Sequence, residues 1–317
     1  MATLEEVLAA LNSATTDARE VLTKLPEIAN TNGDVPFTFA DGTQITLPGL
    51  PKLKAQVDGF IAGAETTIKG WWKRSFYVDA VNGDDNNPGT SDAPFKTLKK
   101  AVDNIPIGGY GKIHIIGDYT MDYSFTVLGK RIAFYSDGNL IFPARLNGDY
   151  NEFTAHIDVV DSSLYFAVGK IITEVADSSK NWRGSNKVAI RQNVGSCGSR
   201  ALGRMNVIID TKCQNDVNVV ELHGGILIGN QDLWGSGDVV PVHVGIKRYD
   251  YTGTSYILKD GGFLLGEFGV ASFVVDVSSY IAVRDSSGNK ITWGDVIQGI
   301  VTDSNGVPRN IVSNILL

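Results

Sequence analysis

Residues 112–142 read KIHIIGDYTMDYSFTVLGKRIAFYSDGNLIF, and this stretch decides the fold. Its apolar runs are short, and Gly, Asn, Asp or Ser stands between them. β-Branched and aromatic residues favour strands, whereas Gly, Asn and Asp favour turns. The same texture continues to residue 283, and no long helical pattern follows Ile105. The sequence therefore predicts a mainly β body over residues 75–283.

The turns between these runs also indicate how the strands are connected. Asn-Gly and Asp-Gly pairs, which typically close hairpins, are few, and the linkers are uneven in length. This pattern disfavours an antiparallel meander and favours a coil in which each turn of chain stacks on the previous one. No strict repeat is visible, so we expect the inward aliphatic residues to match by position and not by identity.

A heptad pattern occupies residues 4–28. Apolar residues recur at spacings of three and four over four heptads, as in a helix that packs on other helices along a narrow seam. The seam residues are Leu4, Val7, Leu11, Ala14, Ala18, Val21, Leu25 and Ile28. Thr3 and Glu6 form a capping-box pattern, and Pro26 is expected to stop or bend the helix. The alternative is an amphipathic helix that lies on its own domain.

Two further elements precede the body. Residues 36–47 predict a small β-hairpin, because apolar residues alternate on both sides of Asp41-Gly42, a two-residue turn signal. A lone hairpin is marginal in water, so we expect it to pack on neighbouring chains. A second helical pattern runs from Leu53 to Trp71, and its glycines favour close packing with other chains.

Composition and charge limit the partners. The 317-residue chain has a net charge of −7, with no basic block to neutralise phosphates, so we expect no nucleic-acid partner. No apolar run is long enough for a membrane span, and the N-terminus lacks a secretory pattern. Cys197 and Cys213 have no metal-ligand spacing and are expected to be buried free thiols, with a disulfide as the alternative. No cofactor or metal is predicted.

The stretch from Phe76 to Asp118 resembles the opening of right-handed parallel β-helix (pectate-lyase-like) domains in bacteriophage tailspikes and tail fibres. The matching segments are Phe76–Asp79, Asn82–Thr90, Pro94–Leu98, Ala101-Val102, Gly108-Gly109 and Lys112–Asp118. In that family the unit is a strand, a polar loop and a capping helix that closes the end of the stack. The same motif also opens β-helix domains of polysaccharide lyases, and the heptad stem favours the phage family.

The resemblance implies a homotrimeric virion protein in a phage tail, assembled in the host cytoplasm. Residues 1–74 would form the helical stem for trimerisation and tail attachment, 75–283 the β-helix, and 284–317 a β cap or tip. The implied partners are other tail or baseplate proteins and either a host-surface polysaccharide or another fibre protein. A non-enzymatic tail fibre or tailspike component that mediates host-surface attachment or connects fibre segments is the first hypothesis. A polysaccharide depolymerase is the second, and a bacterial surface adhesin or lyase is the third.

No catalytic residue stands out in the sequence. A glycosidase needs two carboxylates at a set separation, and no pair is singled out by spacing among Asp158, Asp161, Glu174, Asp177, Asp210, Asp216 and Glu221. A lyase needs a base beside a cation, and the available cations are Lys170, Lys187, Arg191 and Arg204. The histidines, which we expect to be packed on or in strands, are His114, His156, His223 and His243.

Two other groups of residues have an alternative role in binding. A polar loop carries Asp79, Asp84, Asp85 and Asp92, which form turns or, alternatively, bind calcium. The aromatic residues in polar stretches are expected to pack, and alternatively stack on sugar rings; they are Trp182, Trp234, Tyr249, Tyr251 and Trp293.

Overall fold

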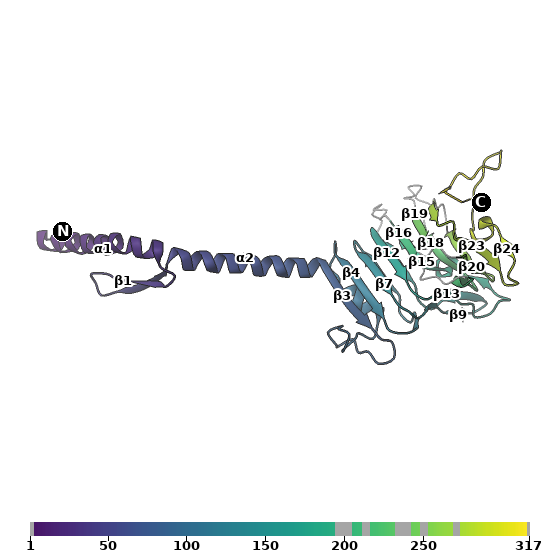
Figure 1. Ribbon diagram of the computed structural model, residues 1–317, viewed down its shortest axis with the longest axis horizontal. Coiled ribbons are helices and arrows are strands. Elements are labelled where there is room, and N and C mark those ends of the chain that lie inside the picture. The colour runs from purple at the N-terminus through teal and green to yellow at the C-terminus, as the bar shows by residue number, and fades with distance from the viewer. Residues whose placement is uncertain are drawn as a thin grey trace. The chain divides into compact units, whose positions relative to one another are not determined.

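The structure is a computed structural model that describes residues 3–193, 205–210, 216–231, 242–247, 253–268 and 273–315. Cys197, Arg204, Cys213, Trp234, Tyr249 and Tyr251 lie outside the described residues. The chain divides into two compact units, Met1–Gly70 and Trp71–Leu317. Each is described by itself (Figure 1).

The first unit begins with helix α1 (Leu4–Asn30). The predicted capping box is confirmed, since Thr3 Oγ1 accepts from Glu6 N at 3.2 Å and Glu6 Oε2 accepts from Thr3 N at 2.7 Å. Pro26 was expected to stop or bend the helix; it does not stop it, because α1 continues to Asn30. Asn30 Nδ2 donates to Pro26 O at 2.7 Å and so ties the last turn together.

Strands β1 (Asp34–Thr38) and β2 (Gln44–Pro48) form the predicted antiparallel hairpin. Its turn differs from the expected two-residue type. Phe39 N donates to Thr43 O at 2.9 Å, which leaves a three-residue connection that ends on Gly42 with a φ of +86°. A two-residue turn of the Asp-Gly kind needs positive φ at both residues, and here only the glycine has it.

Helix α2 (Leu50–Trp72) follows the hairpin directly. Gly49, at the junction, donates its N–H to Gly33 O at 2.9 Å, and a Cβ there would lie 2.1 Å from Thr31 O. Several large apolar side chains of α2 are exposed, among them Leu53, Val57, Phe60 and Ile61. Neither helix of this unit, nor any other in the part of the chain that the structure describes, is long and apolar enough to cross a membrane.

The second unit is mainly β and contains three parallel sheets. The eight-stranded sheet has the order β25-β22-β19-β16-β12-β7-β4-β3. The seven-stranded sheet has the order β24-β23-β20-β17-β13-β8-β5, and the five-stranded sheet β21-β18-β15-β11-β6. All neighbours in these sheets run parallel except β23 and β24. Figure 1 shows β3, β4, β7, β12, β16 and β19 side by side in that order.

The strands of the eight-stranded sheet are β3 (Lys73–Val78), β4 (Tyr110–Ile115), β7 (Arg131–Tyr135), β12 (Ser162–Ala167), β16 (Met205–Asp210), β19 (Val242–Lys247), β22 (Phe273–Val277) and β25 (Ile311–Ser313). Those of the seven-stranded sheet are β5 (Tyr119–Thr120), β8 (Leu140–Phe142), β13 (Ile171–Thr173), β17 (Asn218–Leu222), β20 (Ser255–Lys259), β23 (Ile281–Asp285) and β24 (Lys290–Ile291). Those of the five-stranded sheet are β6 (Phe125–Leu128), β11 (Ile157–Val160), β15 (Val188–Asn193), β18 (Ile226–Gln231) and β21 (Phe263–Phe268).

The chain visits the three sheets in a fixed order. The triplets β6-β7-β8, β11-β12-β13, β15-β16-β17, β18-β19-β20 and β21-β22-β23 each place one strand in the five-, the eight- and the seven-stranded sheet in turn. Each triplet therefore pairs, strand by strand, with the triplet before it. A smaller sheet, β14-β10-β9, branches off between these visits and consists of β9 (Ala144–Asn147), β10 (Tyr150–Phe153) and β14 (Asn181–Trp182).

The core consists of columns of apolar side chains that are stacked by register. In the eight-stranded sheet one buried column runs through Phe76, Ile113, Phe134, Phe166, Ile209, Ile246 and Val277. In the seven-stranded sheet a column runs through Leu140, Ile171, Val220, Ile257 and Val283. The expectation that inward residues match by position is confirmed.

Short helical elements close the second unit. Helix α3 (Leu98–Asp103) packs beside β3 and β4 and buries Leu98, Ala101 and Val102. Phe95 before the helix and Ile105 after it are buried as well. After α3, the 3-10 turns η1 (Gly184–Lys187) and η2 (Trp293–Val296) are the only helical pieces in the part of this unit that the structure describes. β25 completes the eight-stranded sheet beside β22, so residues 284–317 share a sheet with the preceding segment.

Candidate functional site

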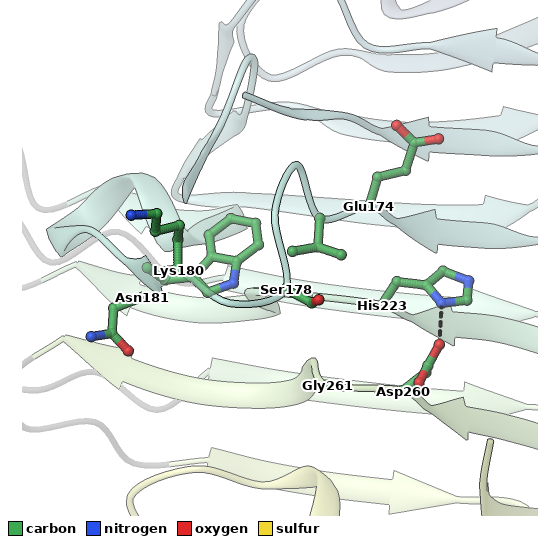
Figure 2. A pocket seen from close by; sticks show the side chains of 10 residues that line it. Glu174, Ser178, Lys180, Asn181, His223, Asp260 and Gly261 are labelled. Atoms are coloured by element: carbon green, nitrogen blue, oxygen red, sulfur yellow. Dashed lines mark hydrogen bonds and ion pairs between the residues drawn. The ribbon is translucent and has the colours of Figure 1, made fainter. Parts of the chain in front are cut away.

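A groove lies at the carboxyl ends of three neighbouring strands of the seven-stranded sheet. β13, β17 and β20 are in register there, with Thr173 opposite Leu222 and Leu222 opposite Lys259. The groove has a volume of about 850 Å³. Its lining residues are Glu174, Val175, Ser178, Lys180, Asn181, Trp182, His223, Gly224, Asp260 and Gly261. Figure 2 shows Glu174, His223 and Asp260, each of which directly follows the last residue of one of these three strands.

Two related turns form the floor of this groove. His223-Gly224-Gly225 and Asp260-Gly261-Gly262 each precede three apolar residues and a glycine, and they stack with Ile226 opposite Phe263 and Gly229 opposite Gly266. The glycines are required. Gly225 and Gly261 have φ of +61° and +95°, and a Cβ on Gly262 would lie 2.9 Å from Gly224 O. This two-copy repeat was not predicted from the sequence, although it appears when the two Gly-Gly pairs are aligned.

His223 stands between two carboxylates. Its Nδ1 lies 3.0 Å from Asp260 Oδ2, drawn as a dashed line in Figure 2, and its Nε2 lies 3.6 Å from Glu221 Oε2. Burial raises the pKa of Glu221, but hydrogen bonds from Lys170 at 2.8 Å and Asn218 at 3.2 Å outweigh burial and hold that pKa below its usual value. An ionised Glu221 and a histidine bonded to a second carboxylate can together hold and pass a proton.

Trp182 forms one wall of the groove. Its ring lies 4.7 Å from that of Phe153, and a Cβ on Gly224 would lie 2.6 Å from Trp182 Cζ2. β14, which carries Trp182, is the third strand of the branching sheet and pairs with β10. The buried Asn151 of β10 donates to the backbone oxygens of Asp177 and Lys180 at 2.7 and 2.8 Å, and so fixes the loop that carries the wall.

The hairpin behind this wall was also missed. β9 and β10 are joined by Gly148-Asp149, with Asn147 opposite Tyr150 and Gly148 at a φ of +61°. The signal Asn147-Gly148 was present in the sequence. A second depression of about 310 Å³ shares Asn181, Trp182 and Gly261 with the groove, so Trp182 has a hollow on each side.

The other candidate carboxylates have structural partners. Asp158 of β11 is buried and ion-paired with Arg191 of β15. Asp210 accepts a hydrogen bond from the Tyr165 hydroxyl, and burial raises its pKa. Asp216 lies 3.1 Å from Arg284 Nη1.

Two more carboxylates lie in turns. Asp177 accepts from Ser179 N at 2.9 Å, which lowers its pKa together with the bond from the Ser179 hydroxyl. Asp161 has a φ of +47° and lines a separate depression with His243. The structure therefore brings Glu174 and Glu221 together near His223, and it places the remaining predicted carboxylates elsewhere.

Two of the histidines pack as predicted. His114 stacks between Tyr77 and Tyr135, with ring centroids 4.9 and 5.5 Å away, and burial lowers its pKa. His156 contacts Arg191, and burial and that guanidinium lower its pKa to about 4. Lys170 pairs with Glu221, and Lys187 lines the smaller depression beside Trp182.

The acidic loop forms turns. Asp79 accepts from the N–H groups of Val81 and Asn82, and Asp84 from that of Asn86. Asp85 accepts from the N–H groups of Lys96 and Thr97 and from the Thr97 hydroxyl, so it ties the loop to the start of α3. Asp92 lies 3.2 Å from the Ser91 hydroxyl. Within the described ranges, no three His, Cys, Asp or Glu side chains gather as a metal ion would require.

The predicted stem seam lies on α1 and faces solvent in the single chain. None of the residues of α1 is buried, and the large seam residues Leu4, Val7, Leu11, Val21 and Leu25 are all exposed. Ala14 and Ala18 are exposed as well, and Ile28 is half-buried. Trp293, another candidate aromatic residue, packs against the core.

Comparisons with protein families, with curated proteins and with solved structures found no match for this chain.

Proposed function

We propose that this protein is a structural component of a bacteriophage tail, a tail fibre or tailspike. Three copies would assemble through the α1 seam, and the second unit of each would form a right-handed parallel β-helix. The stem would attach to other tail proteins, and the body would contact the host surface or the next fibre protein. Three identical bodies would strengthen attachment through avidity without a strong single site.

The observation that carries this proposal is the exposed seam of α1. Leu4 is 83% exposed and Leu11 63%, although each lies on one continuous apolar stripe. Burying a leucine side chain is worth roughly 1.5–3 kcal/mol, so a single chain forgoes this gain several times along one helix. A heptad stripe that its own chain leaves uncovered favours association with copies of itself.

The order of the sheets supports the proposed β-helix. Five successive triplets place one strand in each of three parallel sheets, which supports a coil with three strands in every turn. Right-handedness is supported by the general rule that crossovers between parallel strands of one sheet are almost always right-handed. The resemblance of residues 76–118 to tailspike and tail-fibre domains supports the phage assignment.

Sedimentation equilibrium of the full chain tests the assembly. We expect a species of three times the chain mass of 34.1 kDa. Leu11→Glu should shift the distribution towards single chains, whereas Thr16→Glu, an equally exposed change away from the seam, should leave it unchanged. A wild-type chain that sediments as a monomer at micromolar concentration would refute the trimer.

Labelling of virions tests the tail assignment. Antibodies against the purified protein should bind the tails of the phage that carries it in negatively stained micrographs, and the protein should compete with that phage for adsorption. Labelling elsewhere on the particle, or none, would refute the assignment.

A polysaccharide depolymerase is the second candidate, and the groove favours it. Glu174, Glu221 and Asp260 lie in or beside one open depression walled by Trp182, and carboxylates and an aromatic ring suit a sugar ligand. Incubation with host capsule or lipopolysaccharide should then release reducing ends or unsaturated sugars. Asp260→Asn should abolish this release and Asp276→Asn should not. A receptor that is bound but not cut would set the enzyme aside.

A further inference from the structure

The hairpin β1–β2 has an apolar face of which only half is covered. Val35 is directly opposite Leu47 and Phe37 opposite Ile45, so all four side chains lie on one face of the hairpin. Val35 and Phe37 are buried, while Ile45 and Leu47 are 41% and 43% exposed. β1 packs against α1, and β2 pairs with β1.

The hairpin lies along the C-terminal half of α1, on one flank of the seam. At its tip Ala40 N donates to Asp17 Oδ1 at 2.6 Å, and at its base Gly49 lies against Thr31. The half-covered residues of α1 recur at helical spacing and mark this flank: Ser13, Asp17, Glu20, Lys24 and Ile28. Thr16 and Thr23, on the side away from the seam, are exposed, so the covered strip extends towards the seam.

The other flank of the seam is unusually apolar. Leu8, Thr15, Leu22 and Ala29 occupy one heptad position there, and none of them is charged. In coiled coils this position usually carries Glu or Lys that pairs across to the next helix. Leu8 and Leu22 are 56% and 65% exposed and lie outside the predicted seam. Uncharged residues at this heptad position indicate that another apolar surface covers it in the assembled protein.

Parallel helices bring these two flanks together. In a parallel bundle the flank that precedes the seam on one helix adjoins the flank that follows it on the next helix. Asp17 and Lys24 lie on the first of these flanks, under the hairpin, and Leu22 lies on the second. At about 1.5 Å per residue, Leu22 is level with the hairpin, whereas Leu8 lies roughly 13 Å beyond its tip at Asp17.

We propose that each hairpin clamps the neighbouring copy in the trimer: Ile45 and Leu47 of one chain pack on Leu22 of the next. β2 reads Gln-Ile-Thr-Leu-Pro and carries no charge, which suits an uncharged partner surface. In the clamp, the exposed half of the hairpin face and the exposed Leu22 of the next chain cover each other. This inference rests on the proposed trimer and adds a second interface, outside the seam, around the ring of three helices.

Cysteine pairs in the full chain test the clamp, in a background with Cys197→Ser and Cys213→Ser. Leu22→Cys with Leu47→Cys should give a covalent trimer on a non-reducing gel after mild oxidation, because each chain links to the next. Leu8→Cys with Leu47→Cys is the matched control and should not cross-link. A disulfide within one chain, or no disulfide in a protein that sediments as a trimer, would overturn the clamp and leave the trimer intact.

A matched pair of polar substitutions gives a second readout. Leu22→Gln should raise the concentration at which trimers dissociate by about tenfold or more, and Leu8→Gln, at the same heptad position, by much less. Equal effects of the two changes would contradict the clamp. A wild-type chain that never sediments above monomer mass would refute the proposed function itself, so the two failures are distinguishable.

Discussion

Lowering the pH from 7 to 5 should destabilise the second unit through His156. This residue directly precedes β11, where Ser124 Oγ is 3.3 Å from its Nδ1 and a guanidinium nitrogen of Arg191 of β15 contacts its Nε2. Because Arg191 donates to Nε2, the proton of the neutral ring is on Nδ1 and points to Ser124. Protonation would turn Nε2 from a hydrogen-bond acceptor into a second donor, and this N–H would face the positively charged guanidinium of Arg191.

The size of the effect follows from the pKa of His156 in the folded protein. Burial, and then the charge of Arg191, lower it to about 4, while Asp158 at 3.9 Å opposes them. An unfolded histidine has a pKa of about 6.5, so the unfolded chain binds the proton first as the pH falls. Stability from this group is complete above about pH 6.5 and is lost between that pH and about 4. The loss is about 2 kcal/mol by pH 5 and roughly 3 kcal/mol in full.

Urea unfolding followed by tryptophan fluorescence, at pH 8, 7, 6 and 5, measures this loss. His156→Gln keeps a hydrogen-bonding side chain but cannot take up a proton, so the variant should lose about 2 kcal/mol less than the wild type between pH 7 and 5. Between pH 8 and pH 7 the unfolding free energies of the two proteins should change with pH by the same amount. Parallel curves for both proteins down to pH 5 would refute the reasoning.

Three further changes test the packing. Phe134→Ala removes a fully buried ring stacked 5.0 Å from Phe166 and should cost about 3–5 kcal/mol of unfolding free energy in urea; a cost below about 1 kcal/mol would contradict the stacked column. Gly49→Ala should lower the melting temperature, because the added Cβ would meet Thr31 O at 2.1 Å. Gly59→Ala lies in open space and should stabilise α2 by about 1 kcal/mol. Circular dichroism melts in which Gly49→Ala melts at a higher temperature than Gly59→Ala would refute this. Asp85→Ala removes three hydrogen bonds to Lys96 and Thr97 and should cost about 1–3 kcal/mol, while Asp92→Ala should stay within about 0.5 kcal/mol; equal costs would show that the loop is not held through Asp85.

Much of the fold was predictable because its signals are local. The heptad of residues 4–28 gave α1, and the short apolar runs gave the strands of the second unit. The short helix expected after the polar loop is present as α3. In each case the spacing of apolar residues along the chain matches the period of the element that buries them.

Local signals failed where several conformations share one composition. Asp41-Gly42 suits a two-residue turn, but only Gly42 takes a positive φ and the connection holds three residues. Pro26 removes one N–H from α1, and the helix absorbs this loss because the neighbouring turns remain bonded. Asn147-Gly148 was a strong signal, but it belongs to a branch from the main sheets and not to a run of alternating strands.

The groove was not predictable from carboxylate spacing, because its partners come from different turns of the chain. His223 and Asp260 are 37 residues apart, Asp158 and Arg191 are 33 apart, and Lys170 and Glu221 are 51 apart. These separations follow the uneven length of each turn, so no fixed sequence period reveals them. The Gly-Gly pairs at 224–225 and 261–262 do reveal a separation of 37 residues. A Cβ is excluded from the second pair by the backbone of the first, and from the first pair by the side chains of Trp182 and Phe153. In a chain of this kind, repeated glycine pairs are therefore a better guide to which polar residues meet than the spacing of the polar residues themselves.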